Sequence, residues 1–531
     1  MTHIIMTNTG AKLLGADAQA VSIASDILSY DVEGQTYNAG FRAGTWNGKK
    51  SFLRMPDMIF EAGFVPLVRR ALAENGYPVT VHDRREHVEA LGPAIDLGSP
   101  TGHDDGGFAE YAGYLDGISL RDFQARIVED FTAEKRGVIQ VATGGGKTEI
   151  GIAITKRIGR ATLFLTHKLD LVRQTRERYR KRLGKNVGMI SEGEWFPAEI
   201  TVATVQTIMS HLKKEPEKVL AFLRSIELLI VDEAHRSSGD SFVKIISECT
   251  NAYYRASLTA TPLMKGKRED DLKLIASSGN IICKITNREL IERGILAQPS
   301  FSFIEVPAFE WNEKQAKKSA GSTTGALYQL AYKVGIVENE LRNRMIVRES
   351  LRLASEGRKT VILVQREQHG EILNRMMREA GLKSRWVFGK NGADEREEAL
   401  ADLRSGAINP LISSTILDEG LDCDAISAVI LAGGGKSKIS LFQRVGRSVR
   451  KKKGEELDLL GNTARIIDFV DTGQKILMKH SAMRYKAVRD EEGWIVENLV
   501  RWDEKERIGL TQPLAAPVFA SALLSSLSFY R

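Results

Sequence analysis

The sequence predicts an α/β fold made of two tandem lobes with parallel β-sheets, preceded by a small α+β N-terminal domain. From Val138 onward, short uninterrupted apolar runs alternate with helix-like stretches, the pattern of strands that are buried on both faces. The same rhythm restarts near Thr360. Residues 98–117 are rich in Gly, Asp, Pro and Ser and lack hydrophobic periodicity, as expected of a linker between the N-terminal domain and the lobes.

Length and composition limit the number of domains and the kinds of partner and metal site that we expect. With 531 residues, 43% of them hydrophobic, the chain has room for about three domains with buried cores. The net charge of +7 is small for this length and therefore says little about partners. Because Cys249, Cys283 and Cys423 lie too far apart in sequence for a zinc ribbon, we expect free thiols, a reducing compartment and no structural metal.

Neither end of the sequence predicts export or membrane insertion. Met1–Gly15 lacks the basic start and the sustained apolar core of a signal peptide. Residues 510–530 carry no charge, but Pro513, Pro517 and several serines dilute them below what a membrane-spanning helix requires. We therefore expect a cytoplasmic protein without a membrane span, and we interpret the C-terminal residues as a docking tail or a short buried helix.

The small N-terminal domain, residues 1–97, holds a patch in which aromatic side chains alternate with cations. Its members are Tyr37, Phe41, Arg42, Trp46, Lys49, Lys50, Phe52 and Arg54. This mixture suits stacking on bases and contact with phosphates, so Arg42, Trp46 and Lys49 are candidate ligands of nucleic acid. The alternative is that the aromatics form the core of the domain while the lysines face solvent.

Each lobe has a set of expected strands. In the first lobe, residues 118–297, they lie at VIQVAT, ATLFLTH, TVATVQT, ELLIVDE and RASLTATP. In the second lobe, residues 298–490, they lie at TVILVQR, SRWVFG, PLISST, AVILAG and ARIIDFV. Residues 491–531 form a C-terminal extension whose role the sequence leaves open.

The strongest local signal is a glycine-rich segment directly after the strand VIQV. It consists of Ala142, Thr143, Gly144, Gly145, Gly146, Lys147 and Thr148. Glycines let backbone amides curl around phosphates, Lys147 reaches the terminal phosphates and Thr148 ligates Mg²⁺. The strict pattern requires glycine where this chain has Val141, so the motif needs support from elsewhere in the sequence.

That support is an acidic pair that ends another buried strand. Leu228–Val231 is followed by Asp232, Glu233, Ala234 and His235, which places two carboxylates at the carboxyl edge of the predicted sheet, where ligands bind. Asp232 suits a magnesium ligand, and Glu233 suits the base that orients and deprotonates the attacking water. The sequence therefore predicts ATP and Mg²⁺ as cofactors.

These residues resemble the motifs of superfamily 2 helicases of the DEAH-lettered kind, and the resemblance continues in order from about Leu120 to Arg450. It implies two RecA-like lobes with the nucleotide bound in the cleft between them, and a nucleotide-binding role for His235. Arg121 and Gln124 lie in the segment LRDFQ, which resembles the family's adenine-reading segment.

Further segments of the first lobe resemble other motifs of these motors. The strand-end residues Thr166, His167, Lys168, Thr204, Gln206 and Thr207 resemble segments that hold one strand by its phosphates. Ser257–Pro262 resembles the segment that couples hydrolysis to strand movement. Arg268–Asp270 is similar to the RED motif of XPB-type DNA helicases.

In the second lobe, Thr415 resembles a phosphate contact to nucleic acid, while Gly420 and Asp422 resemble the ribose-binding part of the same motif. Gln443–Arg450 resembles the arginine-finger helix, with Gln443 at the nucleotide. Because Arg444, Arg447 and Arg450 are spaced three apart, they fall on one helical face, and Arg447 and Arg450 are the candidate catalytic fingers. The alternative is a solvated basic helix end, which we favour for residues 451–453.

Ala432–Ser437 repeats the phosphate-loop lettering after another apolar strand. This lobe lacks a second acidic pair, and in the resembled family the position is a loop that lines the cleft. We therefore expect one nucleotide site and not two.

The resemblance implies an ATP-dependent DNA helicase or translocase that unwinds or remodels duplex and branched DNA, as phage-type recombination and repair helicases do. The RED lettering favours DNA, and an RNA helicase is the first alternative. A duplex translocase of a restriction system is another, although no nuclease-like carboxylate cluster is evident in the sequence. A clamp without turnover is the non-enzyme alternative, and Glu233 and Arg447 argue against it. We expect a monomer or weak oligomer, in the host cytoplasm if the protein is phage-encoded.

Overall fold

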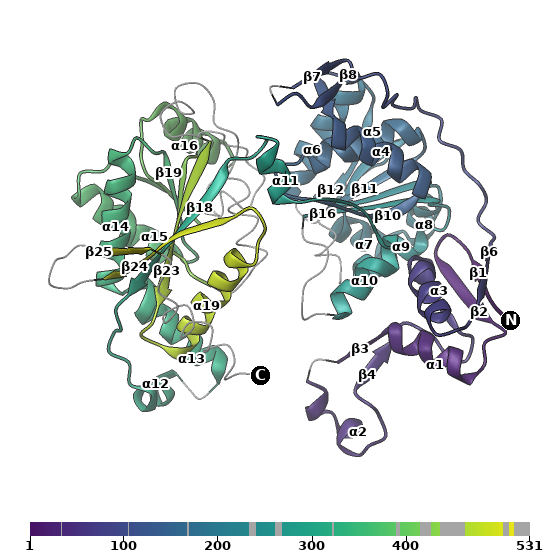
Figure 1. Cartoon of the computed structure of the whole chain (residues 1–531), viewed down its shortest axis with the longest axis horizontal. Helices are drawn as coiled ribbons and strands as arrows, with labels where there is room; N and C mark the ends of the chain where they lie inside the picture. Colours follow the sequence, from purple (N-terminus) through teal and green to yellow (C-terminus); the bar gives the residue numbers. More distant parts are fainter. Residues whose placement is uncertain are drawn as a thin grey trace. The chain divides into compact units, whose positions relative to one another are not determined.

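The computed structural model of the chain (Figure 1) describes residues 1–32, 34–104, 106–166, 169–232, 240–260, 268–320, 323–388, 393–414, 426–435, 462–502 and 509–513. The chain divides into two compact units, Met1–Ile285 and Thr286–Arg531. Within the described residues, no helix combines the length and the apolar composition that a membrane span requires.

The N-terminal domain is a four-stranded sheet covered by two helices. Its elements are β1 (Thr2–Met6), β2 (Gly10–Leu14), α1 (Ala18–Ile27), β5 (Ile59–Glu61), η2 (Ala62–Phe64), α3 (Val65–Glu74) and β6 (Val79–Asp83). The sheet order is β5-β2-β1-β6, in which β6 runs parallel to β1 and the other pairs are antiparallel. Alternate residues of β1 and β2 are buried, so one face of the sheet packs against α1 and α3 around Ile4, Leu13 and Val68.

A short arm leaves this domain between α1 and β5 (Figure 1). It consists of β3 (Ser29–Asp31), η1 (Gln35–Tyr37), α2 (Ala39–Arg42) and β4 (Lys49–Ser51), and β3 pairs with β4 in antiparallel register. We call residues 29–51 the arm.

Residues 98–117, expected to be a linker, contain β7 (Gly102–His103) and β8 (Ala109–Leu115). Together with β9 (Ile118–Arg121) they form a three-stranded antiparallel sheet. The Gly- and Asp-rich stretch between β7 and β8 is a turn, in which Asp104 accepts hydrogen bonds from the amides of Gly106 and Phe108. The sequence predicted a linker here because turns and linkers are rich in the same residue types, so composition alone does not distinguish them.

The first lobe has an eight-stranded sheet in the order β13-β12-β14-β11-β15-β16-β10-β17. Its strands are β10 (Arg136–Val141), β11 (Thr162–Thr166), β12 (Val187–Ser191), β13 (Glu194–Phe196), β14 (Ile200–Thr204), β15 (Leu228–Asp232), β16 (Tyr254–Thr259) and β17 (Ile281–Ile285). All neighbouring pairs are parallel except β12–β13. Every residue of β11, β14, β15 and β16 is buried, which confirms the expectation of strands covered on both faces.

Helices cover both faces of this sheet (Figure 1). They are α4 (Asp122–Glu134), α5 (Lys147–Ile158), α6 (Leu169–Leu183), α7 (Val205–Lys214), α8 (Pro216–Arg224), α9 (Asp240–Glu248) and α10 (Arg268–Ser278). Helix α5 contacts α4 and α6, whereas α7, α8 and α9 contact one another. The helices α5, α6 and α7 directly follow β10, β11 and β14, so their N-terminal ends lie at the carboxyl edge of the sheet.

The second unit repeats this architecture with the strand order β20-β21-β19-β22-β23-β18-β24-β25. Its strands are β18 (Gln298–Val306), β19 (Thr360–Leu363), β20 (Arg385–Val387), β21 (Leu411–Ser413), β22 (Ala428–Leu431), β23 (Thr463–Asp471), β24 (Ile495–Trp502) and β25 (Gly509–Pro513). Its helices are α11 (Asn287–Glu292), α12 (Glu313–Ala320), α13 (Thr324–Tyr332), the π-helical turn η4 (Lys333–Val337), α14 (Glu340–Ser355), α15 (Glu367–Glu379), α16 (Ala393–Ser405) and α19 (Lys475–Arg489). Only the β24–β25 pair is antiparallel.

Two boundaries of the second unit differ from the expected ones. Residues 286–297, expected to close the first lobe, belong to the second unit, where Asn287 donates a hydrogen bond of 2.9 Å to Glu491. In the expected C-terminal extension, β24 and β25 extend the main sheet of the second unit. The sequence did not predict these strands, because residues 501–507 carry mixed charges and the edge strand β25 needs no continuous apolar run.

Candidate active site

The glycine-rich segment joins β10 to α5. Gly144 and Gly146 have φ values of 92° and 85°, in the left-handed region that side chains other than glycine avoid, and Gly146 caps the helix that begins at Lys147. A Cβ atom on Gly146 would lie 2.4 Å from Nε2 of Gln124, so the loop has no room for one. Since the first-turn amides of α5 have no partner within the helix, the loop and the helix end together form a site suited to phosphate.

Gln124 connects α4 to this loop. Its Oε1 accepts a hydrogen bond of 3.0 Å from the Arg121 amide, and its Nε2 donates one of 3.0 Å to the Gly145 carbonyl. The side chain is only 3% exposed. A primary amide has a second N–H and further lone pairs, so adenine recognition by Gln124 stays a prediction, with loop support as an additional role that the sequence did not indicate.

Asp232 lies at the same edge of the sheet as this loop. It is the last residue of β15, is 8% exposed and stands level with Leu258 of β16, while Thr259 of β16 stands level with Gln140 of β10. The ends of the three strands are therefore adjacent. Burial raises the pKa of Tyr179 of α6; its hydrogen bond with Thr155 opposes this shift, and the nearby Asp232 and Glu149 carboxylates add to it.

The chemistry of these side chains fits a magnesium nucleotide. The carboxylate of Asp232 and the hydroxyl of Thr148 are hard oxygen donors of the kind that Mg²⁺ prefers. Lys147, in the first turn of α5, supplies the positive charge that a triphosphate requires. Thr143 is half-buried in the loop, as Lys147 and Thr148 are in the helix.

The strand ends predicted to hold nucleic acid divide into buried and exposed positions. Thr166 and Thr204 are paired in register, and both are buried. The Thr204 hydroxyl accepts the Thr207 amide at 3.4 Å and donates to the buried Thr207 hydroxyl at 3.0 Å, so it caps α7. Gln206 between them is exposed. Of these four residues, only Gln206 presents its side chain to a ligand in this conformation.

The aromatic and basic patch of the N-terminal domain also divides into two parts. Phe52 packs against the domain core, whereas Tyr37, at 81% exposure, lies on the arm. Arg42, Lys49 and Lys50 are exposed on the arm as well. Trp46 is half-buried, and its Nε1 donates a hydrogen bond of 2.8 Å to the Lys49 carbonyl. Tyr30 of the arm also belongs to this core, whereas the exposed Tyr37, Arg42, Lys49 and Lys50 are available for another role.

Other predicted site residues lie outside the described part of the chain. They are His167, Lys168, Glu233, His235, Thr415, Gly420, Asp422, Gln443, Arg447 and Arg450.

Comparison with known families and proteins places this geometry in context. Residues 117–264 match the family described as the res subunit of type III restriction enzymes, and residues 342–452 match the helicase conserved C-terminal domain. The DNA 3'-5' translocase XPB2 of Sulfurisphaera tokodaii is 28% identical over 365 residues, which cover 64% of this chain and 81% of that protein. The ATP-dependent DNA helicase uvsW of Enterobacteria phage T4 is 21% identical over 497 residues, or 88% of this chain and 93% of that protein.

The chain belongs to the superfamily 2 helicases of the XPB/UvsW-like kind.

The fold of this helicase is also found in solved structures. A fragment of a putative HsdR subunit of a type I restriction enzyme from Vibrio vulnificus YJ016 matches with a TM-score of 0.53 and 21% identity, over 73% of this chain and 70% of that one. This match confirms the predicted α/β architecture with two RecA-like lobes, and the family models and the sequence relatives confirm the predicted family.

The second glycine-rich loop of the helicase, residues 432–435, has a different environment from the first. Its four carbonyl oxygens each accept a hydrogen bond from a side chain. Ala432 accepts from Arg342 at 2.7 Å, Gly433 from Tyr332 at 2.7 Å, Gly434 from Gln365 at 3.0 Å and Gly435 from Arg484 at 2.7 Å. A phosphate-binding loop must offer amide N–H groups, whereas the protein interior here binds the loop by its carbonyls.

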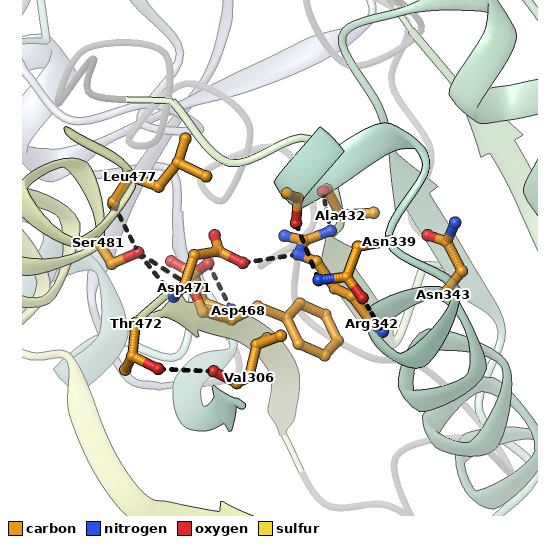
Figure 2. Close-up of polar contacts among 12 residues, drawn as sticks. Val306, Asn339, Arg342, Asn343, Ala432, Asp468, Asp471, Thr472, Leu477 and Ser481 are labelled. Atoms are coloured by element: carbon orange, nitrogen blue, oxygen red, sulfur yellow. Dashed lines mark hydrogen bonds and ion pairs between the residues drawn. The ribbon is translucent and has the colours of Figure 1, made fainter. Parts of the chain in front are cut away.

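Buried ion pairs fix the two arginines that bind this loop, Arg342 of α14 and Arg484 of α19. Figure 2 shows the Arg342 guanidinium between the Asp471 carboxylate, at 2.8 Å, and the Ala432 carbonyl. Arg342 is fully buried and also stacks over the Phe469 ring at 4.9 Å. Arg484 binds both carboxylate oxygens of Asp468, at 2.8 and 3.0 Å. Each charge has an opposite partner, as burial requires.

The burial of Arg342 and Arg484 beside this loop was not predicted from the sequence. The helical spacing could have indicated the burial of Arg342. Arg342 lies three and four residues before the buried Met345 and Ile346, which places it on the core-facing side of α14. A cation at such a position requires a buried acid, and β23 supplies Asp468 and Asp471.

Proposed function

We propose that this chain is an ATP-dependent DNA helicase that unwinds or remodels duplex and branched DNA in replication, recombination or repair, and that it acts in the cytoplasm. The observation that carries the proposal is the glycine-rich loop, which opens α5 at the sheet edge where the buried Asp232 also ends its strand. The named activities of XPB2 and uvsW support DNA as the substrate.

Within the proposed nucleotide site, Lys147 and the loop Thr143–Gly146 bind the phosphates, while Thr148 and Asp232 hold Mg²⁺. The metal, when bound, neutralises charge that develops on the phosphate oxygens. Glu233 orients and deprotonates the attacking water. Arg447 and Arg450 supply guanidinium groups to the γ-phosphate, which contributes about 10³ to 10⁵ in rate.

We also propose which residues contact the base and ribose of the nucleotide and which contact the nucleic acid. The nucleotide's base and ribose are contacted by Arg121, Gln124, His235, Gly420, Asp422 and Gln443. The nucleic-acid strand is contacted by Thr166, His167, Lys168, Thr204, Gln206, Thr207 and Thr415. For the buried Thr166, Thr204 and Thr207, the contact requires the backbone amides at the strand and helix ends or a local rearrangement.

We also propose that the exposed arm contacts DNA. Arg42, Lys49 and Lys50 offer charge to phosphates, and Tyr37 and Trp46 offer rings for stacking. In these terms residues 1–97 are an accessory DNA-binding domain, and the two RecA-like lobes form the motor.

One experiment tests substrate and activity together. ATPase rates are measured with single-stranded DNA, duplex DNA, a Holliday junction and RNA, in parallel with strand displacement from the same DNA substrates. We expect stimulation by DNA and displacement that requires ATP. Stimulation by RNA alone would instead indicate an RNA helicase, and translocation on duplex without displacement would indicate a restriction-type translocase. Absence of any nucleic-acid stimulation would refute a motor function.

A further inference from the structure

One side chain of α10 joins the motor to the base of the arm. Arg268, the first residue of that helix, donates from Nε to the Ser29 carbonyl at 2.7 Å. Its Nη2 donates to the carbonyls of Ile27 at 2.8 Å and Asp26 at 3.4 Å. One guanidinium therefore binds three backbone carbonyls where α1 ends and the arm begins.

The chemistry of this contact is that of a helix C-cap supplied from another domain. The last carbonyls of α1 have no partner within the helix and carry a partial negative charge. A guanidinium suits this position because its donors are held in a rigid planar fork and its charge is permanent. Since Ser29 is the first residue of β3, the same contact fixes the direction in which the arm leaves the domain.

Glu269, the next residue of α10, forms a second link to the arm. The Lys273 ammonium lowers the pKa of Glu269, and the Tyr30 hydroxyl and the Lys50 ammonium lower it further. Tyr30 and Lys50 are paired across β3 and β4. The first turn of α10 thus contacts one strand of the arm and attracts the exposed cation on the other.

The body of the N-terminal domain is held on the first lobe by separate contacts. Leu272 of α10 is buried in the core of the domain, and Ile275 and Ala276 pack against it. A Cβ atom on Gly63 would lie 2.0 Å from the Ile275 carbonyl, so η2 and α10 approach backbone to backbone. Arg136 of β10 donates to the Asn8 carbonyl at 2.7 Å. Loss of Arg268 therefore weakens the attachment of the arm without releasing the domain.

Helix α10 is also the described helix that follows β16 in sequence. Thr259, the last residue of β16, stands at the sheet edge where Asp232 and the phosphate loop lie. The arm is therefore attached to an element next in the chain to the nucleotide-binding edge of the first lobe.

We propose that Arg268 is a positioning residue that fixes the arm on the first lobe, so that DNA bound by the arm moves with the lobe that carries the phosphate loop. This role rests on the proposed helicase function and adds a residue through which hydrolysis is converted into strand separation. Arg268 does not contact the nucleotide in this role, so its loss uncouples hydrolysis from unwinding and leaves hydrolysis itself intact.

The test uses the full-length protein and the variants Arg268→Ala and Arg268→Lys. In Arg268→Ala we expect ATPase kcat and KM with single-stranded DNA to stay within about twofold of wild type, since no nucleotide contact is lost. Base pairs of a junction unwound per ATP should fall about tenfold, the scale of one charge-assisted hydrogen bond. Amide hydrogen exchange should quicken in residues 26–51 and stay unchanged in residues 1–14. Arg268→Lys should recover only part of the loss, because a point charge cannot reproduce the planar fork.

Arg70→Ala is the matched control, because Arg70 is exposed on α3 and pairs with Glu74 of the same helix. It should match wild type in every measurement. Unchanged exchange in the arm, unchanged unwinding despite faster exchange, or an ATPase loss as large as the unwinding loss would each overturn the positioning role. If the wild-type protein itself fails to unwind DNA, the helicase proposal fails, while exchange in the arm and junction affinity of the variants still decide whether Arg268 positions it.

Discussion

The two glycine-rich loops of this chain have similar sequences but different hydrogen-bonding environments. At residues 142–146 the loop presents a helix N-terminus, and its Gly145 carbonyl accepts a hydrogen bond from the Gln124 side chain. At residues 432–435 all four carbonyls are bound by side chains, two of them by buried arginines. The first environment leaves amides for an anion, whereas the second uses cations to hold the carbonyls of the loop.

This difference shows that a glycine-rich pattern determines which backbone conformations are possible, whereas neighbouring charged side chains determine whether the loop can bind a phosphate. Glycine permits close approach and positive φ in both loops. The acid near the first loop is Asp232, the last residue of a neighbouring strand, while Asp468 and Asp471 near the second loop form buried ion pairs with Arg484 and Arg342. Substitutions in the two loops should therefore have separable effects.

The largest contrast is expected for the two loop lysines. Lys147→Ala should abolish ATPase activity, because the terminal phosphates lose their cation. Lys436→Ala should leave nucleotide binding intact. Steady-state ATPase assays and titration with a fluorescent nucleotide measure both effects. The opposite result would identify residues 432–437 as the nucleotide site.

The next largest effect is expected for the buried cation of the second loop. Arg342→Met leaves Asp471 buried without its partner and should lower the free energy of unfolding by about 3–5 kcal/mol, as measured by urea denaturation. Arg344→Met is the control on the same helix, because Arg344 forms an exposed pair with Glu340 and should change stability by under about 0.5 kcal/mol. Equal effects of the two substitutions would remove the role assigned to the buried pair.

A smaller effect separates the glycines. Gly146→Ala forces a side chain into a left-handed conformation and against Gln124, so ATP affinity should fall about tenfold, the equivalent of 1–2 kcal/mol. Gly434→Ala, with a φ of 57° and a Cβ atom 3.0 Å from Ile336 Cδ1, should lower the melting temperature and leave ATP affinity unchanged. Nucleotide titration and thermal unfolding of both variants provide the comparison, and reduced ATP affinity in Gly434→Ala would contradict it.

The smallest effect is expected for one neutral hydrogen bond. Tyr332→Phe removes the donor to the Gly433 carbonyl and should cost about 1 kcal/mol of stability. Tyr328→Phe is its control, since among the described residues no hydrogen bond of the Tyr328 hydroxyl is found, and its ring contacts Tyr332. Denaturant unfolding of both variants measures the difference, and a null result for Tyr332→Phe would mean that water replaces the hydroxyl.

The sequence was most informative where burial and chemistry coincide. Continuous apolar runs predicted β10, β11, β14, β15 and β16 because strands covered on both faces require them. The loop before Lys147 and the acid at Asp232 could be predicted for a similar reason, since phosphate and metal chemistry narrow the choice of residue types.

It was least informative where one residue type serves two purposes. A threonine at position 204 is compatible with a helix cap or with a phosphate contact, and the structure shows the cap. Gly and Asp at residues 98–117 serve turns as well as linkers. The partners of Arg268 and Arg342 lie 239 and 129 residues away in sequence, so no local pattern could reveal them.

The burial of Leu272 in the core of the N-terminal domain has an evolutionary consequence. A helix of the motor completes the interior of the accessory domain, so the two cannot have been exchanged as independent cassettes without a matching change on each side. Related motors that carry a different leading domain should therefore differ at the positions equivalent to Leu272, Ile275 and Ala276, and a shortened chain that begins at the motor should aggregate through this exposed surface unless those positions are made polar.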